Sequence, residues 1–524
     1  MRILLTLILA IVAISCTSKE QKEINNQRQK SYAEEYRPQF HFSPEKMWMN
    51  DPNGMVYYEG EYHLFYQHYP DDNVWGPMHW GHAISTDLVH WQHQPVALYP
   101  DSLGMIFSGS AVVDWNNTSG LGSTNNPPLV SIYTIHSREG EESGRSDFQT
   151  QGIAYSLDKG RTWIKYANNP VLKNPGIRDF RDPKVTWFDN SKKWIMTLAV
   201  QDHLEFYSSP NLIDWTKESE FGSNLGAHGG VWECPDLFEV KVQGTDESKW
   251  VLLVSINPGG PNGGSATQYF VGDFDGRNFT TEQTETKWLD YGRDNYAGVT
   301  WSDIPKEDGR RLFIGWMSNW SYATVVPTEK WRSATTIPRE LVLENVNDEY
   351  IVTSAPVIEL ETIRNEKIEI PSQVVSGLVQ LETENIEPMR SEMKFSFQLK
   401  SDLQNNSPEE FGIVLKNERG EDFKIGYLPA ERLFYTDRSK GGVDSFSDNF
   451  AGKHTAEYKA GETMEIHLFV DEASVEVFVD GGLLVFTDIV FPTESYNKVE
   501  LFSKNGSIKL QKCDVWSLNS IWEP

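Results

Sequence analysis

The sequence contains few cysteines, few cations and little sign of helical periodicity. Its three cysteines, Cys16, Cys234 and Cys513, lie far apart and show no metal-ligand spacing, so a disulfide framework is not expected. The 47 Lys and Arg residues are outnumbered by 75 Asp and Glu residues, which gives a formal charge of −28. This charge repels nucleic acid and anionic membrane surfaces, so we expect a neutral ligand and no nucleic-acid partner.

Long apolar runs are also missing, apart from one at the N-terminus. The apolar run 3–14 follows Arg2, is too short to cross a bilayer, and ends just before Cys16. Small residues before a cysteine are typical of a bacterial lipoprotein signal, so residues 1–16 are predicted to be a signal peptide with Cys16 as the acylated residue; an ordinary secretory peptide is the alternative. The polar residues 17–35 are expected to form a flexible tether. We therefore expect an exported protein that meets a membrane of the bacterial envelope only through a lipid anchor, or is otherwise secreted.

Aromatic residues and glycine are abundant, with 18 Trp, 21 Tyr, 26 Phe and 39 Gly. This composition favours short strands joined by tight turns, and hence an all-β protein. One phrase, a polar turn between two strands that ends on an aromatic residue, recurs at residues 85–91, 156–163, 208–215 and, more loosely, 272–279. The intervals exceed the roughly 40–50 residues of a four-stranded propeller blade and suit blades with long insertions. A fifth unit around residues 311–320 would complete the ring, whereas a sandwich with irregular hairpins is the alternative.

A chain of this length is expected to hold two or three domains, and its pattern changes after about residue 355. Beyond that point come runs of alternating apolar and polar residues, such as MEIHLFVD and SVEVFVDG, separated by short turn signals. Such alternation predicts an antiparallel sandwich. We therefore expect a five-bladed propeller over residues 36–350, a linker over 351–366 and a β-sandwich over 367–524.

Three acids stand out by their surroundings. Asp51 lies in the turn-forming stretch WMNDPNG, Asp182 in RDFRDP, and Glu233 in GGVWECPD, each near a predicted strand end in a separate candidate blade. The innermost strands of a propeller start at the same end of the channel, so these acids can converge. A pair of carboxyl groups, one ionised and one protonated, is the usual machinery of glycoside hydrolysis. Taken singly, each acid is equally explained as a structural turn residue.

The neighbours of two of these acids predict opposite protonation states. Asn50 and Asn53 offer hydrogen bonds that keep Asp51 ionised, whereas apolar surroundings from Trp232 and Cys234 would keep Glu233 protonated.

Longer motifs carry a family resemblance. The runs RPQFHFSPEKMWMNDPNGMVYY, WGPMHWGHAISTDLVHW, FRDPKV, HGGVWECPDLFE and WRSATTIPREL resemble glycoside hydrolase family 32, the β-fructosidases, and most of all bacterial secreted levanases. The resemblance runs from about residue 36 to the C-terminus and implies a five-bladed propeller followed by a sandwich. It also implies Asp51 as nucleophile, Glu233 as acid/base, and Asp182 as the residue that binds fructosyl hydroxyls and stabilises the transition state. Further positions matched around the terminal fructosyl unit are Asn50, Gln67, Trp75, Phe107, Ser108, Arg181, Asp294 and Trp316. Asn295 departs from the family motif, which has Phe at that place.

The resemblance implies retaining, exo-acting hydrolysis of terminal β-D-fructosyl residues from fructans, with release of fructose. Levan is the preferred substrate, with inulin and sucrose as further candidates, and an endo-levanase or an invertase is the alternative on the same scaffold. A non-catalytic fructan-binding lipoprotein is the alternative from another class. No cofactor or metal is expected, because the histidines between residues 63 and 93 form no ligand triad. Linkage preference and oligomeric state stay open.

Overall fold

The computed structural model describes residues 32–383, 386–399 and 407–522. The expected signal peptide with Cys16, and the expected tether up to residue 31, lie outside this part of the chain. Within the described residues, no helix has the length and apolar character needed to cross a membrane.

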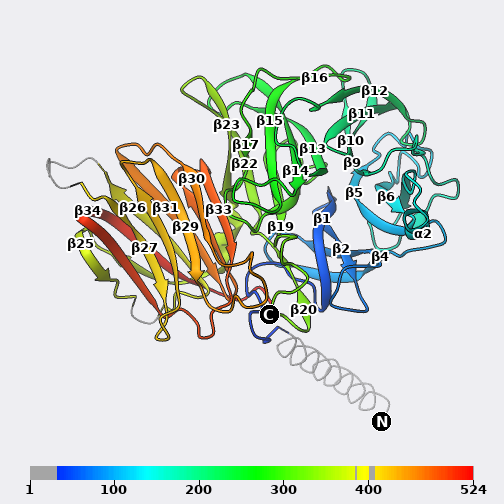
Figure 1. Cartoon of the computed structure of the whole chain (residues 1–524). Coiled ribbons are helices and arrows are strands. Elements are labelled where there is room, and N and C mark those ends of the chain that lie inside the picture. Colours follow the sequence, from blue (N-terminus) through cyan, green and yellow to red (C-terminus); the bar gives the residue numbers. More distant parts are fainter. Residues whose placement is uncertain (1–31, 384–385, 400–406, 523–524) are drawn as a thin grey trace, which may run out of the picture.

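The N-terminal domain is a five-bladed β-propeller, as expected (Figure 1). The first blade contains β1 (Met47–Tyr58), β2 (Glu61–Tyr69), β3 (His79–Ser85), β4 (Gln92–Leu98) and β20 (Trp331–Arg332). The second contains β5 (Met105–Val113), β6 (Leu129–His136), β7 (Gln149–Ser156) and β8 (Ile164–Lys165). The third contains β9 (Phe180–Phe188), β10 (Lys193–Val200), β11 (His203–Ser209) and β12 (Thr216–Phe221). The short strand β20 pairs in parallel with β1, so a segment from late in the chain completes the first blade and closes the ring.

The last two blades carry longer and more irregular connections. The fourth contains β13 (Val231–Lys241), β14 (Ser248–Asn257), β15 (Ala266–Phe274), β16 (Phe279–Thr280) and β17 (Lys287–Trp288). The fifth contains β18 (Tyr296–Thr300), β19 (Arg311–Met317), β21 (Ala334–Thr335), β22 (Arg339–Val346) and β23 (Glu349–Pro356). A one-turn helix, α2 (Arg138–Glu142), interrupts the connection between β6 and β7. Strands such as β6 are buried along their whole length because neighbouring blades cover both faces.

The recurring sequence phrase is the turn between the third and fourth strands of a blade. In three blades a side-chain oxygen accepts backbone N–H bonds from residues two and three positions later, as when Asp87 accepts from Val89 (3.0 Å) and His90 (2.8 Å). Asn211 and Asp275 occupy the same place in the third and fourth blades. In the second blade Asp158 accepts from Thr162, four positions later (2.9 Å). The recurring phrase therefore corresponds to a turn that needs a short acceptor side chain, and the aromatic residue after the turn anchors the outer strand.

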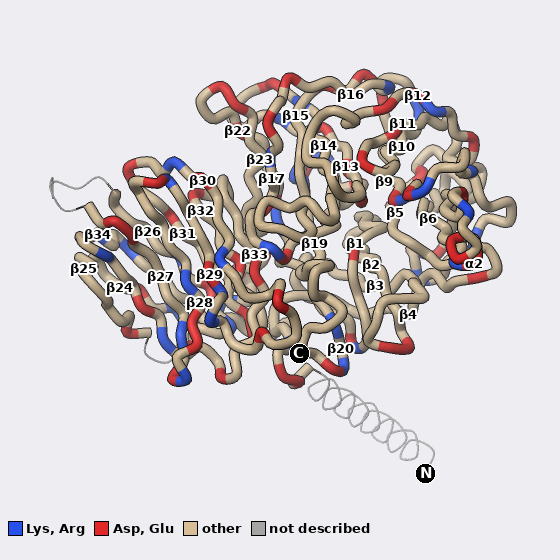
Figure 2. Tube along the Cα trace, in the orientation of Figure 1, with Lys and Arg blue, Asp and Glu red and all other residues tan. Residues whose placement is uncertain are grey.

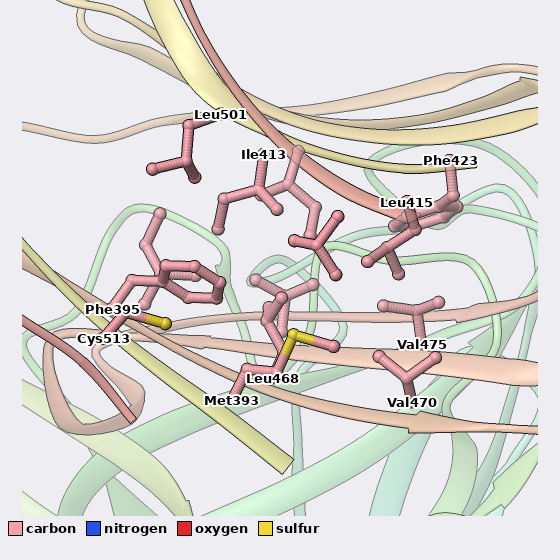
Figure 3. Packing of buried hydrophobic residues seen from close by; sticks show 14 of the residues in the cluster. Met393, Phe395, Ile413, Leu415, Phe423, Leu468, Val470, Val475, Leu501 and Cys513 are labelled. Carbon is pink, nitrogen blue, oxygen red and sulfur yellow. The ribbon is translucent and has the colours of Figure 1, made fainter. Parts of the chain in front are cut away.

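The C-terminal domain is a β-sandwich built around one long strand, β34 (Lys498–Leu518), which pairs with strands in both layers. The other strands are β24 (Arg364–Ile370), β25 (Gln373–Gln380), β26 (Ser391–Gln398), β27 (Glu410–Lys416), β28 (Asp422–Leu428), β29 (Leu433–Lys440), β30 (Lys453–Glu457), β31 (Thr463–Asp471), β32 (Ser474–Val479) and β33 (Leu484–Ile489). The inward side chains, among them Met393, Phe395, Ile413 and Leu468, pack into one apolar core (Figure 3). A 3₁₀ turn, η2 (Asp480–Gly482), joins β32 to β33.

The segment expected as a linker, residues 351–366, is regular structure. Strand β23 continues the fifth blade to Pro356, a 3₁₀ helix η1 (Ile358–Ile363) follows, and β24 begins at Arg364. The two domains lie side by side (Figure 1), and along the chain η1 leads directly from the last strand of the propeller to the first strand of the sandwich.

Buried charges connect the two domains. Arg339 of β22 donates to Glu476 of β32 and, at 3.1 Å, to Asp290. The ring of His41 lies between Asp471 (2.7 Å) and Glu476 (2.8 Å). Burying such charges is costly unless they are paired, so the pairs hold the sandwich against the propeller in one orientation. Acidic positions occur over both domains, in keeping with the strongly negative charge of the chain (Figure 2).

Candidate active site

The five innermost strands of the propeller, β1, β5, β9, β13 and β18, contact one another around the central channel. Each blade is irregular at the same level, because the register between its innermost strand and the next one shifts there. A bulge bends a strand and redirects its side chains, so five bulges at one level can turn side chains from every blade toward the channel end. The residues at or beside these shifts are Asp51, Ser108, Asp182, Glu233 and Tyr296.

A cavity of about 320 Å³ opens at this end of the channel. Most of the residues expected from the sequence line it: Asn50, Asp51, Gln67, Trp75, Phe107, Ser108, Arg181, Asp182 and Glu233. The cavity is also lined by residues that sequence reasoning did not select: His136, Glu141, Gln149, Asp179, Asn257 and Trp320. The three acids chosen for their context are thus brought together from the first, third and fourth blades.

Asp51 lies at a bulge inside strand β1, and not in the turn expected from WMNDPNG, and its neighbours fix the direction of its carboxylate. Ser108 donates a hydrogen bond to one oxygen (2.8 Å) and Asn50 to the other (3.1 Å). Gly54 has φ = 56°, and a Cβ there would lie 2.6 Å from the Trp80 ring, so only glycine fits that position. Burial, followed by the charge of Glu233, raises the pKa of Asp51, while the two hydrogen bonds act in the opposite direction.

Asp182 adopts a positive φ of 63°, which a hydrogen-bonded strand rarely allows. Its backbone N–H donates to Thr134 Oγ1 (2.9 Å), and its carboxylate accepts from the backbone N–H of Cys234 (3.0 Å). Burial raises the pKa of Asp182 to about 7; Arg181 opposes this rise, and the charges of Glu233 and Asp51 add to it. Strain and burial at one acid are typical of a functional site rather than of a structural turn.

Glu233 has polar partners, which corrects the expectation of apolar surroundings. Arg181 donates twice to its Oε1, through Nε (3.1 Å) and Nη2 (2.8 Å), and the Tyr296 hydroxyl donates to Oε2. The Trp232 ring instead packs in the core between the third and fourth blades, because neighbouring strand residues point to opposite faces. Tyr296 was not selected from the sequence, although the DNYA motif contains it.

The thiol of Cys234 faces two other acids of the site, Asp51 and Asp182. Its sulfur lies 3.5 Å from Asp51 and 3.6 Å from Asp182. Burial and these neighbouring charges raise the pKa of Cys234 well above that of an ordinary thiol, so it remains protonated and acts as a weak donor between two carboxyl groups.

Aromatic rings form part of the cavity wall. Trp75, which is 40% exposed, contacts Phe107 edge-on at 5.8 Å, and Phe107 stacks on His136 at 4.2 Å. Trp320 lines another part of the wall and stacks on Trp48 at 6.0 Å. Rings of this kind suit the C–H faces of a sugar.

The structure does not bring Asp294 and Trp316 to the cavity, which corrects two of the expected positions. Asp294 is fully buried at the domain interface, where it accepts hydrogen bonds from Tyr322 (2.6 Å) and Arg438 (2.5 Å). Trp316 is fully buried behind Trp320, whose ring is 4.9 Å away. Trp320, four residues later in the same GWMSNW motif, faces the cavity instead.

Asn295, the departure from the family motif, also lies away from the cavity. It is buried and donates a hydrogen bond to Asp290 (3.1 Å), which belongs to the domain interface. This substitution therefore leaves the lining residues in place.

Known proteins share this architecture along nearly the whole chain. The chain is 51% identical to a levanase of Bacillus subtilis, over 94% of its length and 72% of that protein. It is 39% identical to an extracellular exo-inulinase of Aspergillus niger, over 94% and 96% of the two chains. A crystal structure of an Aspergillus awamori exo-inulinase superimposes with a TM-score of 0.86 at 36% identity, covering 94% of this chain and all of that one. A Schwanniomyces occidentalis fructofuranosidase in complex with fructose gives 0.85 at 33% identity, over 94% and 99% of the chains.

Family models match both domains. The N-terminal domain model of glycosyl hydrolases family 32 covers residues 41–355, and the C-terminal model of the same family covers residues 359–517. With the propeller, the sandwich and the three converging carboxyl groups, these matches show that the chain belongs to glycosyl hydrolases family 32.

Proposed function

We propose that the protein removes terminal β-D-fructosyl units from fructans as a retaining exo-hydrolase, with levan as the preferred polymer. One observation carries the proposal: three carboxyl groups from three blades meet in one small cavity with a single arginine among them. The names of the relatives, levanase and exo-inulinase, support a fructan as the substrate, and the higher identity to the levanase favours levan.

In this proposal Asp51 attacks the anomeric carbon. Its carboxylate is held by Ser108 and Asn50, and its surroundings exclude most water, so an ionised oxygen is aimed at one point of the cavity. The attack forms a fructosyl ester and breaks the bond to the leaving oxygen, which takes its proton from Glu233. The ionised Glu233 then removes a proton from water, and the water releases fructose with retained configuration.

Asp182 and Arg181 complete the site. Asp182 would hold fructosyl hydroxyls and stabilise positive charge as it develops on the sugar ring, since it lies beside Asp51 and shares Cys234 with it. Arg181 bonds both Asp179 (2.6 Å) and Glu233, so it can orient the acid/base between the two steps.

The size of the cavity supports attack at chain ends. Its volume of about 320 Å³ is at the small end of the range of roughly 300–1,000 Å³ found for ligand sites. A cavity that is this small and bounded by Trp75, Phe107 and Trp320 fits one terminal sugar better than the middle of a chain.

We further propose that the protein is exported and anchored as a lipoprotein through Cys16. The extracellular exo-inulinases among the relatives support export, and the signal-like sequence before Cys16 supports the anchor. Metabolic labelling with a fatty acid tests the anchor: we expect label on the wild type and none on Cys16→Ala, with the same turnover in both. Freely soluble, unlabelled wild-type protein would contradict the proposal.

Incubation of the purified protein with levan, inulin and sucrose, followed by quantification of free fructose, tests the activity. We expect fructose from levan with the wild type, and a fall in its release of at least about 10²-fold with Asp51→Asn or Glu233→Gln. Binding of levan without release of any sugar would instead identify a fructan-binding protein.

A further inference from the structure

We propose that Glu141 determines specificity on the leaving-group side: its carboxylate accepts hydrogen bonds from the fructosyl unit that follows the scissile bond. The inference rests on the proposed function, because it takes a fructan chain as the substrate of the same site. Helix α2 lies in the connection between β6 and β7 of the second blade (Figure 1). Glu141 belongs to this helix and lines the cavity.

The connection that carries Glu141 is fixed to its blade. Ser137 caps α2, since its hydroxyl accepts from the N–H of Gly140 (3.1 Å) while its own N–H donates to the carbonyl of Phe148 (2.8 Å). Gly140 is buried against Phe148, and a Cβ there would lie 3.0 Å from the Phe148 Cβ. The helix therefore sits directly on the blade and holds Glu141 at the cavity edge.

One hydrogen bond and one close contact position the carboxylate without using up its oxygens. Arg178 donates to Oε1 (2.9 Å), and Nε2 of His136 lies 3.1 Å from Oε2 without a hydrogen bond between them. Gln149 lies 3.2 Å from the other ring nitrogen of His136, and its N–H can donate there, which leaves the ring proton on the buried Nε2. Burial lowers the pKa of His136 to about 4, so near neutral pH this ring is a neutral partner.

The carboxylate keeps spare acceptor capacity toward the cavity. An ionised carboxylate has about four lone-pair positions, and among the described residues only Arg178 donates a hydrogen bond to this one. The Glu141 side chain is 37% exposed, against 21% for Glu233, and it lines the same cavity. A hydroxyl-rich ligand at the mouth can therefore reach it.

The position of Glu141 is on the side where the leaving group departs. Its partner Arg178 directly precedes Asp179, which bonds Arg181, which in turn bonds Glu233. Glu233 protonates the leaving oxygen in the proposed mechanism, so the next sugar unit must leave past this wall. Beyond His136 the wall continues through Phe107 to Trp75, so one rim offers both a hydroxyl acceptor and aromatic faces.

Steady-state kinetics of Glu141→Gln on levan and on 4-nitrophenyl β-D-fructofuranoside test the proposal. The aryl fructoside has no second fructosyl unit. We expect the KM for levan to rise about tenfold with kcat nearly unchanged, and both constants for the aryl fructoside to stay within about twofold. Glu139→Gln, an exposed acid of the same helix, is the matched control and should change neither substrate.

A structural role for Glu141 would give another pattern. An equal loss on both substrates would overturn the proposal, because it would mean that α2 only shapes the site. If the wild type is active and Glu141→Gln has unchanged kinetics on levan, the proposed role of Glu141 is overturned and the proposed function stands. A wild type that hydrolyses neither substrate would overturn the proposed function as well.

Discussion

Arg181 donates two hydrogen bonds to one carboxylate oxygen of Glu233, at 3.1 and 2.8 Å, while the Tyr296 hydroxyl donates to the other oxygen. Both oxygens of the acid/base are therefore engaged in the free protein. This arrangement suits the second half of the proposed reaction, in which the ionised carboxylate activates water. It also ties the orientation of Glu233, in the fourth blade, to residues of the third and fifth blades, so three consecutive blades shape this part of the site.

Glu233→Gln should separate the two steps of the reaction. The leaving oxygen of a fructan needs a proton, so we expect kcat on levan to fall roughly 10²–10⁴-fold. An aryl fructoside with an acidic phenol needs far less help, so its first step should be much less affected, as a burst of phenol would show. Glu239→Gln, an exposed acid on the same strand, is the control. Equal loss on both substrates would show that Glu233 is structural.

The pH dependence should report on Asp51. Burial and the charge of Glu233 raise the pKa of Asp51, and the nucleophile must be ionised to attack. Activity should therefore fall with decreasing pH earlier than for an ordinary aspartate of pKa 3.8. Ser108→Ala removes a hydrogen bond that lowers the pKa of Asp51, so its acid limb, measured as kcat/KM on an aryl fructoside, should move to higher pH. A shift to lower pH would contradict this role of the hydrogen bond.

Trp320→Ala should weaken sugar binding. Trp320 lines the cavity, and loss of its ring removes a stacking face, so we expect kcat/KM on levan to fall about tenfold. Trp115→Ala is the control, because this exposed indole does not line the cavity. The same loss in both variants would mean that stability, and not the wall, is being measured.

The His41 pairs should make stability depend on pH. Asp471 and Glu476 raise the pKa of His41 to about 9 against the pull of burial, from 6.5 for an unperturbed histidine. The folded pKa is higher, so the stabilisation, on the order of 3 kcal/mol, is fully present below pH 6.5 and is lost as pH rises toward 9. The melting temperature should fall over that window in the wild type and change less in His41→Gln. His90→Gln, at an exposed pair, should follow the wild type.

Convergence of the three acids could be predicted from the sequence for a physical reason. Asp51, Asp182 and Glu233 each lie within two residues of a following Pro and near a strand start, and blade geometry places such starts at one end of the channel. The repeated turn phrase likewise indicated the first four blades, because each has an acceptor side chain at the turn between its third and fourth strands.

Side-chain direction near the bulges could not be predicted in the same way. A period-two pattern fails where a strand gains a residue, so neither the polar partners of Glu233 nor the inward turn of Trp320 in place of Trp316 follows from alternation. Glu141 lies in an insertion between two strands, and its approach to the cavity depends on the packing of Phe148 and Arg178 rather than on any motif. The family motif predicted Asp294 at the fructosyl unit, but Arg438 of the sandwich, which is distant in sequence, holds it at the domain interface.

The time course of products from levan tests the central claim most directly. A cavity that holds one terminal unit predicts free fructose as the first and dominant product, with the remaining polymer staying long throughout the early reaction. Chromatography of the products, combined with the size distribution of the residual levan, gives both quantities. Early accumulation of levan oligosaccharides with little free fructose, and a rapid fall in polymer length, would contradict exo-hydrolysis.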